Sequence, residues 1–273
     1  MRLTPAALLL VPVFAAACTT LSPDEPTIPQ QNTLGTGLRI ADIQNPSSNY
    51  YKLAIANPTT GVNVTVSSTV VTWIDTFDET KDGKSIGTVY IQDIGSQQPY
   101  SGIDIFEPSY VPASLRLFPG DVLDFVGPYE EATGVGSASF SGAGTLPQLE
   151  KPVGTFRYTF DTPPPTTIQL ADLNQFTSYK AGRQWENMLV TLNDISVGIG
   201  SVDTSGKRVS YLMTQDDDAG SAGADAATLT NELYNLGAQD FAPGTHFKSV
   251  TGIVTWFYGY SVAPRSVDDL VLE

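Results

Sequence analysis

The sequence predicts an all-β protein made of two small β-barrels in tandem, and three observations support this fold class. Short runs with the alternating or β-branched pattern of strands recur along the chain, between turns rich in glycine and proline. No stretch sustains a helical period. The strand candidates form two sets of about five, each within about 100 residues, which is typical of small barrels.

Each set of strand candidates can be placed along the chain. The first set comprises residues 62–74 (VNVTVSSTVVTWI), 88–93, 102–106 and 121–126, with 138–140 as a candidate fifth strand. The second set comprises residues 187–197, 208–215, 247–257 and 260–263. Residues 161–167 (DTPPPTT) form a stiff, extended linker between the sets, because consecutive prolines favour that conformation. We therefore expect barrels over 60–160 and 168–273, and short helices are compatible with 168–176 and 227–236.

A faint internal repeat connects the two sets. Pro119-Gly120 precedes DVLDFVG, and Pro243-Gly244 precedes THFKSVTG. In each case a Pro-Gly turn leads into a strand candidate that ends in glycine. The repeat indicates that the second barrel is a copy of the first.

Several segments resemble the OB-like domains that recur in secreted bacterial nucleases and surface lipoproteins. In the first half these segments are VVTWID (70–75), VYIQD (89–93), YSGIDIF (100–106) and FPGDVLDFVG (118–127). In the second half they are WENMLV (185–190), PGTHFKSVTGIV (243–254) and APRSVDD (263–269). The resemblance implies two tandem five-stranded OB-like barrels, although Glu186-Asn187-Met188 departs from the commoner Glu-Gly-Met. Secreted nucleases carry such domains beside a separate catalytic domain, and none fits in this chain.

The N-terminus has the pattern of a secretory signal peptide over residues 1–17. Arg2 supplies the positive charge, and the apolar run from Ala6 to Ala17 is too short to span a bilayer as a helix. Three alanines stand directly before Cys18, which resembles the lipobox of bacterial lipoproteins and implies acylation of Cys18. The alternative is a plain signal-peptidase site with an incidental cysteine. Because Cys18 is the only cysteine and lies at the end of the apolar run, the sequence favours lipidation.

Residues 18–59 are expected to connect the lipidated cysteine to the first barrel. Residues 19–36 are rich in Thr, Ser, Pro and Gln without any period, which is typical of a flexible tether. Residues 38–43 (LRIADI) are compatible with a short docked strand. Thr19 rather than aspartate follows Cys18, which favours the outer membrane in species that use aspartate as a retention signal.

The charge of the chain argues against nucleic acid as a partner. The chain has 14 basic and 29 acidic residues, and loss of Arg2 with the signal peptide gives 13 − 29 = −16. Between residues 60 and 150 only Lys81, Lys84 and Arg116 face 12 acidic residues, a net charge of −9. A groove that follows a phosphate backbone needs a basic stripe, and neither half of the sequence has one.

Little in the sequence points to catalysis or to a metal. The single His246 opens a strand candidate, and no G-x-S-x-G motif accompanies it, so we expect a surface histidine. The acidic stretch with Asp75, Asp78, Glu79 and Asp82 lacks EF-hand spacing and favours a hairpin turn over a calcium site. The same holds for the acidic loop Asp216-Asp217-Asp218. No cofactor and no metal site are expected.

Strand alternation points to one candidate ligand face. In TVYIQD, Val89 and Ile91 share the inner face, and in GIDIF the inner residues are Ile103 and Ile105. The outer face between these strands is the usual ligand platform of OB barrels, where aromatic side chains stack on bases or sugars. The alternative is that this face packs against the second barrel or the N-terminal segment. The residues that we expect on it are Tyr90, Gln92, Asp104 and Phe106.

These observations lead to a functional hypothesis. The chain is expected to be a non-enzymatic lipoprotein of the bacterial cell envelope that binds or organises an envelope protein or glycan, held to the lipid bilayer through Cys18. The alternative is a nucleic-acid-binding accessory protein of an extracellular nuclease system.

Overall fold

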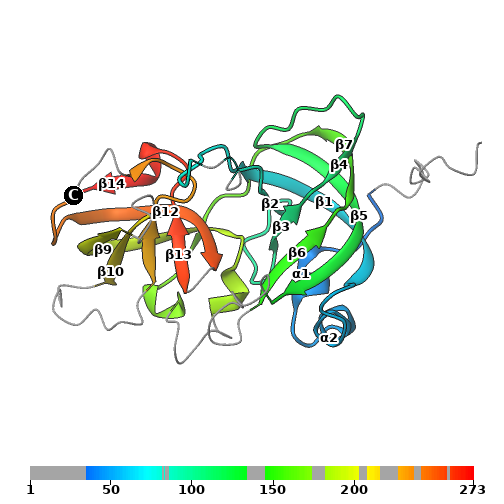
Figure 1. Ribbon diagram of the computed structural model, residues 1–273, viewed down its shortest axis with the longest axis horizontal. Coiled ribbons are helices and arrows are strands. Elements are labelled where there is room, and N and C mark those ends of the chain that lie inside the picture. Colours follow the sequence, from blue (N-terminus) through cyan, green and yellow to red (C-terminus); the bar gives the residue numbers. More distant parts are fainter. Residues whose placement is uncertain are drawn as a thin grey trace, which may run out of the picture.

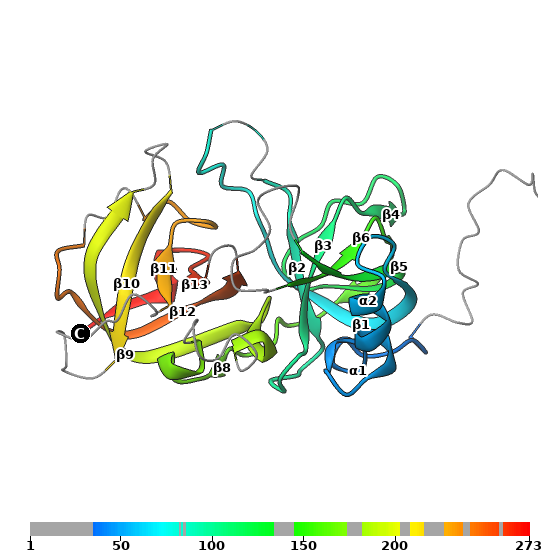
Figure 2. The ribbon, with the colours of Figure 1, turned by 60° about the horizontal axis from the view of Figure 1, so that its bottom comes forward.

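The protein folds into two closed five-stranded β-barrels (Figure 1, Figure 2). The computed structural model describes residues 35–81, 83, 86–133, 145–173, 182–202, 208–215, 227–236, 241–256 and 259–273. The candidate strand at 138–140 lies outside these described residues, as do the N-terminal segment with Cys18 and most of the tether. The predicted all-β fold class is confirmed.

The first barrel closes where its first strand pairs with two neighbours. Strand β1 is antiparallel to β2 along one part and to β5 along another, with an irregularity between Val66 and Thr69. This long, bent strand turns the sheet back on itself. The barrel strands are β1 (Val62–Ile74), β2 (Val89–Asp93), β3 (Gly102–Phe106), β5 (Asp121–Ala132) and β6 (Leu146–Glu150), and β7 (Val153–Thr159) and β4 (Ser109–Val111) extend the sheet beyond β5.

The second barrel closes in the same way, through pairing of β9 with both β10 and β12. Its strands are β9 (Leu189–Val202), β10 (Val209–Gln215), β11 (Thr228–Thr230), β12 (His246–Trp256) and β13 (Tyr260–Ala263). The described residues of this half also form two short strands, β8 (Thr166–Thr167) and β14 (Leu270–Leu272), and the 3₁₀ helices η3 (Leu170–Leu173), η4 (Arg183–Trp185) and η6 (Val267–Asp269).

The two barrels share one topology, which fits tandem OB-like domains. Around each ring the strands follow the order first, second, third, fifth, fourth and back to the first. The third and fifth strands pair in parallel in both barrels, β3 with β6 and β11 with β13. The Pro-Gly repeat falls directly before the fourth strand of each barrel, where Gly120 and Gly244 have φ angles of +96° and +86°. These left-handed conformations explain why glycine recurs there.

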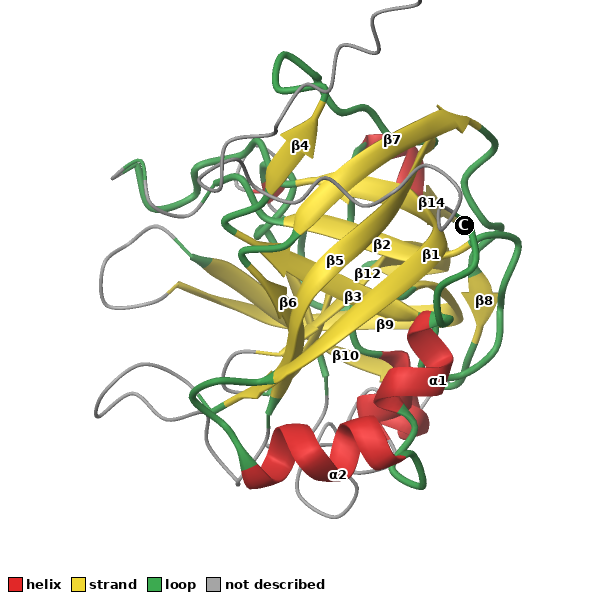
Figure 3. Cartoon of the chain, turned by 90° about the vertical axis from the view of Figure 1, so that its right-hand side faces the viewer, coloured by secondary structure: helices red, strands yellow, loops and turns green. Residues whose placement is uncertain are grey.

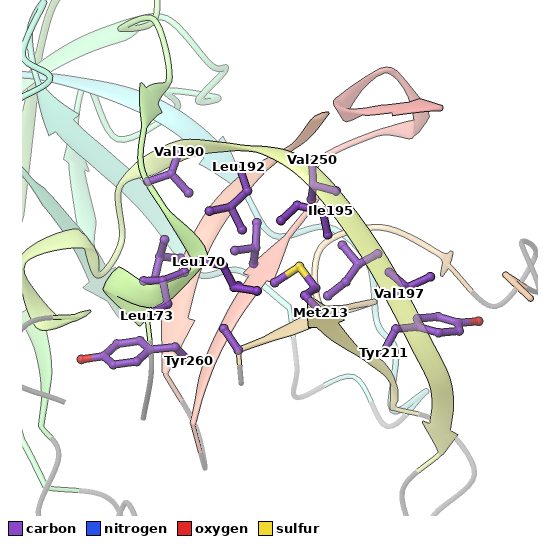
Figure 4. Close-up of a cluster of buried hydrophobic side chains, with 14 of the residues drawn as sticks. Leu170, Leu173, Val190, Leu192, Ile195, Val197, Tyr211, Met213, Val250 and Tyr260 are labelled. Carbon is purple, nitrogen blue, oxygen red and sulfur yellow. The ribbon is translucent and has the colours of Figure 1, made fainter. Parts of the chain in front are cut away.

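Each barrel has its own apolar core. In the first barrel Val89, Ile91, Ile103 and Ile105 all point inward, which confirms the predicted alternation of β2 and β3. In the second barrel, side chains from β9, β10, β12, β13 and η3 meet in one cluster (Figure 4).

Two sequence-based expectations about local structure are wrong. Residues 38–43 do not form a strand: only Leu38 makes an isolated bridge to Val66, and the chain then forms helix α1 (Ile40–Gln44), followed by α2 (Asn49–Ala56). The Asp93 carboxylate accepts hydrogen bonds from the Ile40 and Ala41 amides at 2.9 and 3.2 Å, which stabilises the start of α1.

The expected helix at 227–236 is replaced by β11, because Leu229 pairs with β13 and fills the second core. In the segment 168–176, where a short helix is also compatible with the sequence, residues 170–173 form the single turn of η3, and residues 174–176 lie outside the described part of the chain. Among the described residues, no helix is long and apolar enough to cross a membrane.

Candidate functional site

The candidate ligand face on β2 and β3 lies mostly between the two barrels. Tyr90, Gln92 and Asp104 are buried, whereas Phe106 at the end of β3 is 47% exposed. Tyr90 and Phe106 therefore do not form one exposed aromatic pair. The physical reason is that the second barrel covers the outer face of β2 and the first part of β3. Of the two alternatives for Tyr90, the structure shows packing against the second barrel.

The apolar part of this interbarrel interface is a separate small cluster. Tyr90 packs with Leu189 at the start of β9, Leu233, Ile253 on β12 and Ala263 on β13. Trp73, which is half-buried, packs against the same cluster, and the Arg265 guanidinium lies 5.9 Å from its ring centre. The side chains that sequence alternation places outside the first core thus form a shared core with the second barrel.

Hydrogen bonds cross the same interface. Gln92 Oε1 accepts from the Leu189 amide at 3.2 Å, and Asn187 Nδ2 donates to the Pro147 carbonyl at 3.1 Å. Asn187 has a φ angle of +61°, a left-handed conformation that glycine and asparagine adopt most readily. This explains why asparagine is accommodated where the OB-like resemblance expects glycine.

At Gly102 the backbones of the two halves approach each other closely. A Cβ atom at Gly102 would lie 2.5 Å from the Asn187 carbonyl oxygen and 2.7 Å from the Met188 nitrogen. We expect Gly102→Ala to push the barrels apart and to lower the free energy of unfolding by about 1–3 kcal/mol. Thermal unfolding followed by circular dichroism measures this loss. The control is Gly198→Ala on β9, where φ is not positive and the added Cβ atom would lie at an ordinary contact distance of 3.6 Å from the Leu212 carbonyl oxygen. An unchanged melting temperature for Gly102→Ala would contradict close backbone contact.

Arg183 is a buried charged side chain of the second half that contacts the first half. It begins η4 and reaches into the first half, with its side chain only 2% exposed. Its guanidinium donates to both carboxylate oxygens of Glu131 on β5, with the Nε–Oε2 distance at 3.3 Å. It also donates to the Gln44 carbonyl at 3.1 Å and to the Tyr129 hydroxyl at 3.3 Å.

The surroundings of Arg183 complete a buried network. Its guanidinium carbon lies 4.8 Å from the ring centre of Tyr51 on α2. Glu131 is fully buried and also accepts hydrogen bonds from the Tyr129 hydroxyl and, at 2.5 Å, from the Thr145 hydroxyl. Burial has the largest single effect on the pKa of Arg183 and lowers it, but the interactions with Glu131, Tyr129 and Glu186 together outweigh burial and raise the pKa above its ordinary value. The network joins α1, α2 and β5 to η4 at the start of the second half.

Burial raises the pKa of several carboxyl groups in and around this interface. Burial raises the pKa of Asp104 to about 8 and of Asp75 to about 7, and the negative charge of Glu232 adds to both shifts. Burial likewise raises the pKa of Glu186, whose two carboxylate oxygens have no hydrogen-bond partner among the described residues. These groups are buried like core side chains, so their ionisation is coupled to the contact between the barrels.

The carboxylates of the acidic stretch after β1 bind hydrogen-bond donors and a cation of the protein itself. Asp78 accepts hydrogen bonds from the Gly83 amide at 2.8 Å and the Thr80 hydroxyl at 3.2 Å, and the buried Glu79 pairs with Arg208 at 3.1 Å. Within the described part of the chain, no group of three or more acidic, histidine or cysteine side chains is arranged to hold a metal. Asp82 and the loop Asp216-Asp217-Asp218 lie outside the described residues.

His246 begins β12 at the surface, where its Nδ1 lies 3.2 Å from a carboxylate oxygen of Glu273. The sequence analysis also expects a surface position for this histidine. Its neighbour in the ion pair is the C-terminal residue, 80% exposed, so the contact is solvated and contributes little to stability.

The sequence analysis missed Arg183, Glu131 and Glu186. Arg183 and Glu131 are 52 residues apart, and no spacing rule connects residues that meet only through the docking of two barrels. One signal was present in the sequence: basic residues are few, and Arg183 lies two residues before Trp185, the first residue of the WENMLV segment.

The equivalent outer face of the second barrel differs in chemistry. Its strands β10 and β11 turn Tyr211, Met213 and Leu229 inward. The alternate positions on the outer side are Ser210, Leu212, Thr214, Thr228 and Thr230, all partly exposed and without an aromatic ring. This second platform therefore lacks the stacking surface that OB barrels use for bases and sugars.

Comparison with known proteins adds no family: no protein-family model, curated protein or solved structure matches the chain. The functional conclusion therefore depends on the residues and geometry described above.

Proposed function

We propose that the protein is a non-enzymatic lipoprotein of the bacterial cell envelope, in which two OB-like barrels form one binding or scaffold unit. The observation that carries this proposal is the buried interface between the barrels. It fixes the second barrel on the platform of the first through Tyr90, Gln92 and Arg183, so that the pair presents one continuous outer surface. Residues 1–18 support anchoring in the envelope, because an apolar run leads directly to the only cysteine.

The buried acidic groups favour a structural role over catalysis. Asp104 and Glu186 have strongly perturbed pKa values, which is a feature that active sites share. Here both groups are buried, at 6% and 0% exposure. Their arrangement fits an interface that depends on their neutral form.

The resemblance to the OB-like domains of secreted nucleases supports a second candidate, a nucleic-acid-binding accessory protein. Burial of Tyr90 weighs against it, because the aromatic platform for bases is covered. The net charge of −16 after removal of Arg2 also weighs against nucleic-acid binding, because it repels the phosphate backbone. We therefore propose an envelope protein or glycan as the partner, and a mobility-shift assay with single-stranded DNA at low salt separates the two candidates.

The lipid anchor is tested by replacing Cys18. We expect Cys18→Ala to abolish incorporation of labelled fatty acid and to release the protein from the membrane fraction, because no other cysteine can be acylated. Fatty-acid labelling and detergent partitioning of whole cells measure both effects. The matched control is Thr19→Ser, which keeps the cysteine and should label like the parent. A Cys18→Ala protein that still partitions into detergent would refute the anchor.

A further inference from the structure

Three aromatic side chains are exposed at one corner of the first barrel. Phe118 is 64% exposed, Tyr158 49% and Phe160 52%. Large apolar side chains gathered at the surface are a signal of an interaction site, whereas scattered single ones are not. We refer to Phe118, Tyr158 and Phe160 as the aromatic corner.

The backbone holds the aromatic corner together. The Phe160 amide donates to the Gly120 carbonyl at 2.8 Å, and a Cβ atom at Gly120 would lie 2.7 Å from the Phe160 oxygen. Asp121 connects the two segments, because its carboxylate accepts from the Phe118 amide at 2.8 Å and from the Thr159 hydroxyl at 3.3 Å. The rings therefore emerge from a fixed turn between the start of β5 and the end of β7.

The N-terminal segment meets the first barrel close to this corner. The Gly35 amide donates to Asp124 on β5 at 2.5 Å, and Arg157 on β7 pairs with the same carboxylate at 2.7 Å. Phe160 follows Arg157 by three residues, about 10 Å along an extended chain. Figure 3 views the first barrel from the side opposite the second barrel and shows β5 and β7 side by side. The tether attachment and the aromatic corner thus share one pair of strands.

The length of the tether limits how far this region can move from an acylated Cys18. The 17 residues from Cys18 to the residue before Gly35 (35 − 18 = 17) can span at most about 60 Å. Tethering raises the effective concentration of any weak contact between this side of the barrel and the bilayer to the millimolar range. Of the whole folded chain, the region around Gly35 is attached nearest to the bilayer.

The charges around the corner are compatible with a lipid surface. Arg116 is exposed in the segment that leads to Phe118, and it is one of only three basic residues between 60 and 150. Asp121 is buried and Asp124 is neutralised by Arg157, which leaves Asp161 as the exposed acidic neighbour of Phe160. Residues 60–160 carry 12 acidic and 5 basic residues (5 − 12 = −7), whereas this corner is locally close to neutral.

We propose that the aromatic corner inserts into the polar–apolar boundary of the bilayer that holds the acylated Cys18, and so orients the two barrels on the membrane. This inference rests on the proposed lipid anchor. Aromatic rings favour this boundary because they bury an apolar body, and the tyrosine hydroxyl stays at the wet side.

The inference is tested with the mature chain, residues 18–273, carrying Cys18→Ala so that no acyl chain contributes. Flotation with vesicles of phosphatidylethanolamine and phosphatidylglycerol is compared for this protein and for a variant with Phe118→Ser, Tyr158→Ser and Phe160→Ser. We expect the triple variant to bind vesicles at least about tenfold more weakly than the parent, because the variant lacks the three aromatic rings that would be buried in the bilayer. The control is Ile199→Ser on β9, since Ile199 is 77% exposed but belongs to the second barrel. This control variant should bind vesicles as strongly as the Cys18→Ala parent, in which the aromatic corner is intact.

Two outcomes would overturn the inference. One is equal vesicle binding, or equal lack of binding, for the triple variant and its parent when both keep the same melting temperature. The other is photo-crosslinking from position 118 in cells that captures a protein and no lipid, which would assign the corner to a protein partner. Failure of the anchor itself is detected separately by the labelling of Cys18, because the vesicle assay uses protein without acyl chains.

Discussion

Replacing Arg183 with methionine is expected to destabilise the protein by about 3–5 kcal/mol, since it leaves the Glu131 carboxylate buried without its cation. Both side chains are almost completely removed from solvent, at 2% and 0% exposure. The hydroxyls of Tyr129 and Thr145 still donate to Glu131 in the variant, but neutral donors do not replace a positive charge. The loss is measured as a shift of the urea midpoint, followed by circular dichroism.

The design of this experiment separates the charge from the packing. Adding Glu131→Gln to Arg183→Met removes the buried charge, and the double variant should recover part of the stability. The matched control is Lys151→Met, because Lys151 is 61% exposed and pairs with Glu107 and Glu150 at the surface. Its removal should change stability by no more than about 1 kcal/mol. A loss of that small size for Arg183→Met would mean that the network does not hold the barrels together.

Stability is expected to fall as the pH rises from about 4 to about 8, and Asp104→Asn should remove much of this dependence. Burial raises the pKa of Asp104 from 3.8 to about 8, so the folded protein binds a proton that the unfolded chain releases. The stabilising contribution of this proton is complete below the unfolded pKa and is lost as the pH rises through the folded pKa. Glu186 and Glu232, whose pKa values burial also raises, act in the same direction.

At pH 8.5 we expect the Asp104→Asn variant to be more stable than the parent by a few kcal/mol, which corresponds to a melting temperature roughly 5–10 °C higher. At pH 4 the variant and the parent should melt within about 2 °C of each other, because both carry a neutral side chain there. Asp161→Asn is the control, since Asp161 is exposed at the start of the linker. If the parent keeps the same melting temperature from pH 4 to pH 8.5, the carboxyl groups at the interface are not held neutral.

Together these two experiments test whether the barrels act as one unit. The Arg183 network lies on the side of α1, α2 and β5, and Asp104 lies on β3 beside the docked second barrel. If both variants behave as expected, contacts between residues far apart in sequence hold the platform of the first barrel closed. That platform is then unavailable to bases or sugars, and binding must use the outer surface of the pair.

The local parts of the fold were predictable because they follow from short-range physical chemistry. Strand β1 has the same bounds, 62–74, in the sequence prediction and in the structure, because β-branched residues fill it and turn residues flank it. The inward direction of Val89, Ile91, Ile103 and Ile105 followed from the two-residue period of a strand. The Pro-Gly repeat correctly marked equivalent strands, since both of its glycines require a positive φ.

Other local predictions failed because a distant residue decided the outcome. Helix α1 begins where it does because Asp93, more than 50 residues away, accepts its first amides. Strand β11 forms because Leu229 finds a partner strand in β13 and a place in the second core. In both segments the intrinsic preference was weak, so tertiary contacts prevailed.

By itself, the sequence determined the all-β class, the two barrels, the inner faces of their strands and the apolar run that leads to Cys18. These features depend on residue type and on spacings of a few residues, which the order of the chain contains directly. Only the tertiary structure decided what covers the outer face of β2 and β3, and which cation meets Glu131. Alternation specifies that Tyr90 points out of its own barrel, but whether solvent or a second barrel lies there depends on how two separately closed sheets dock.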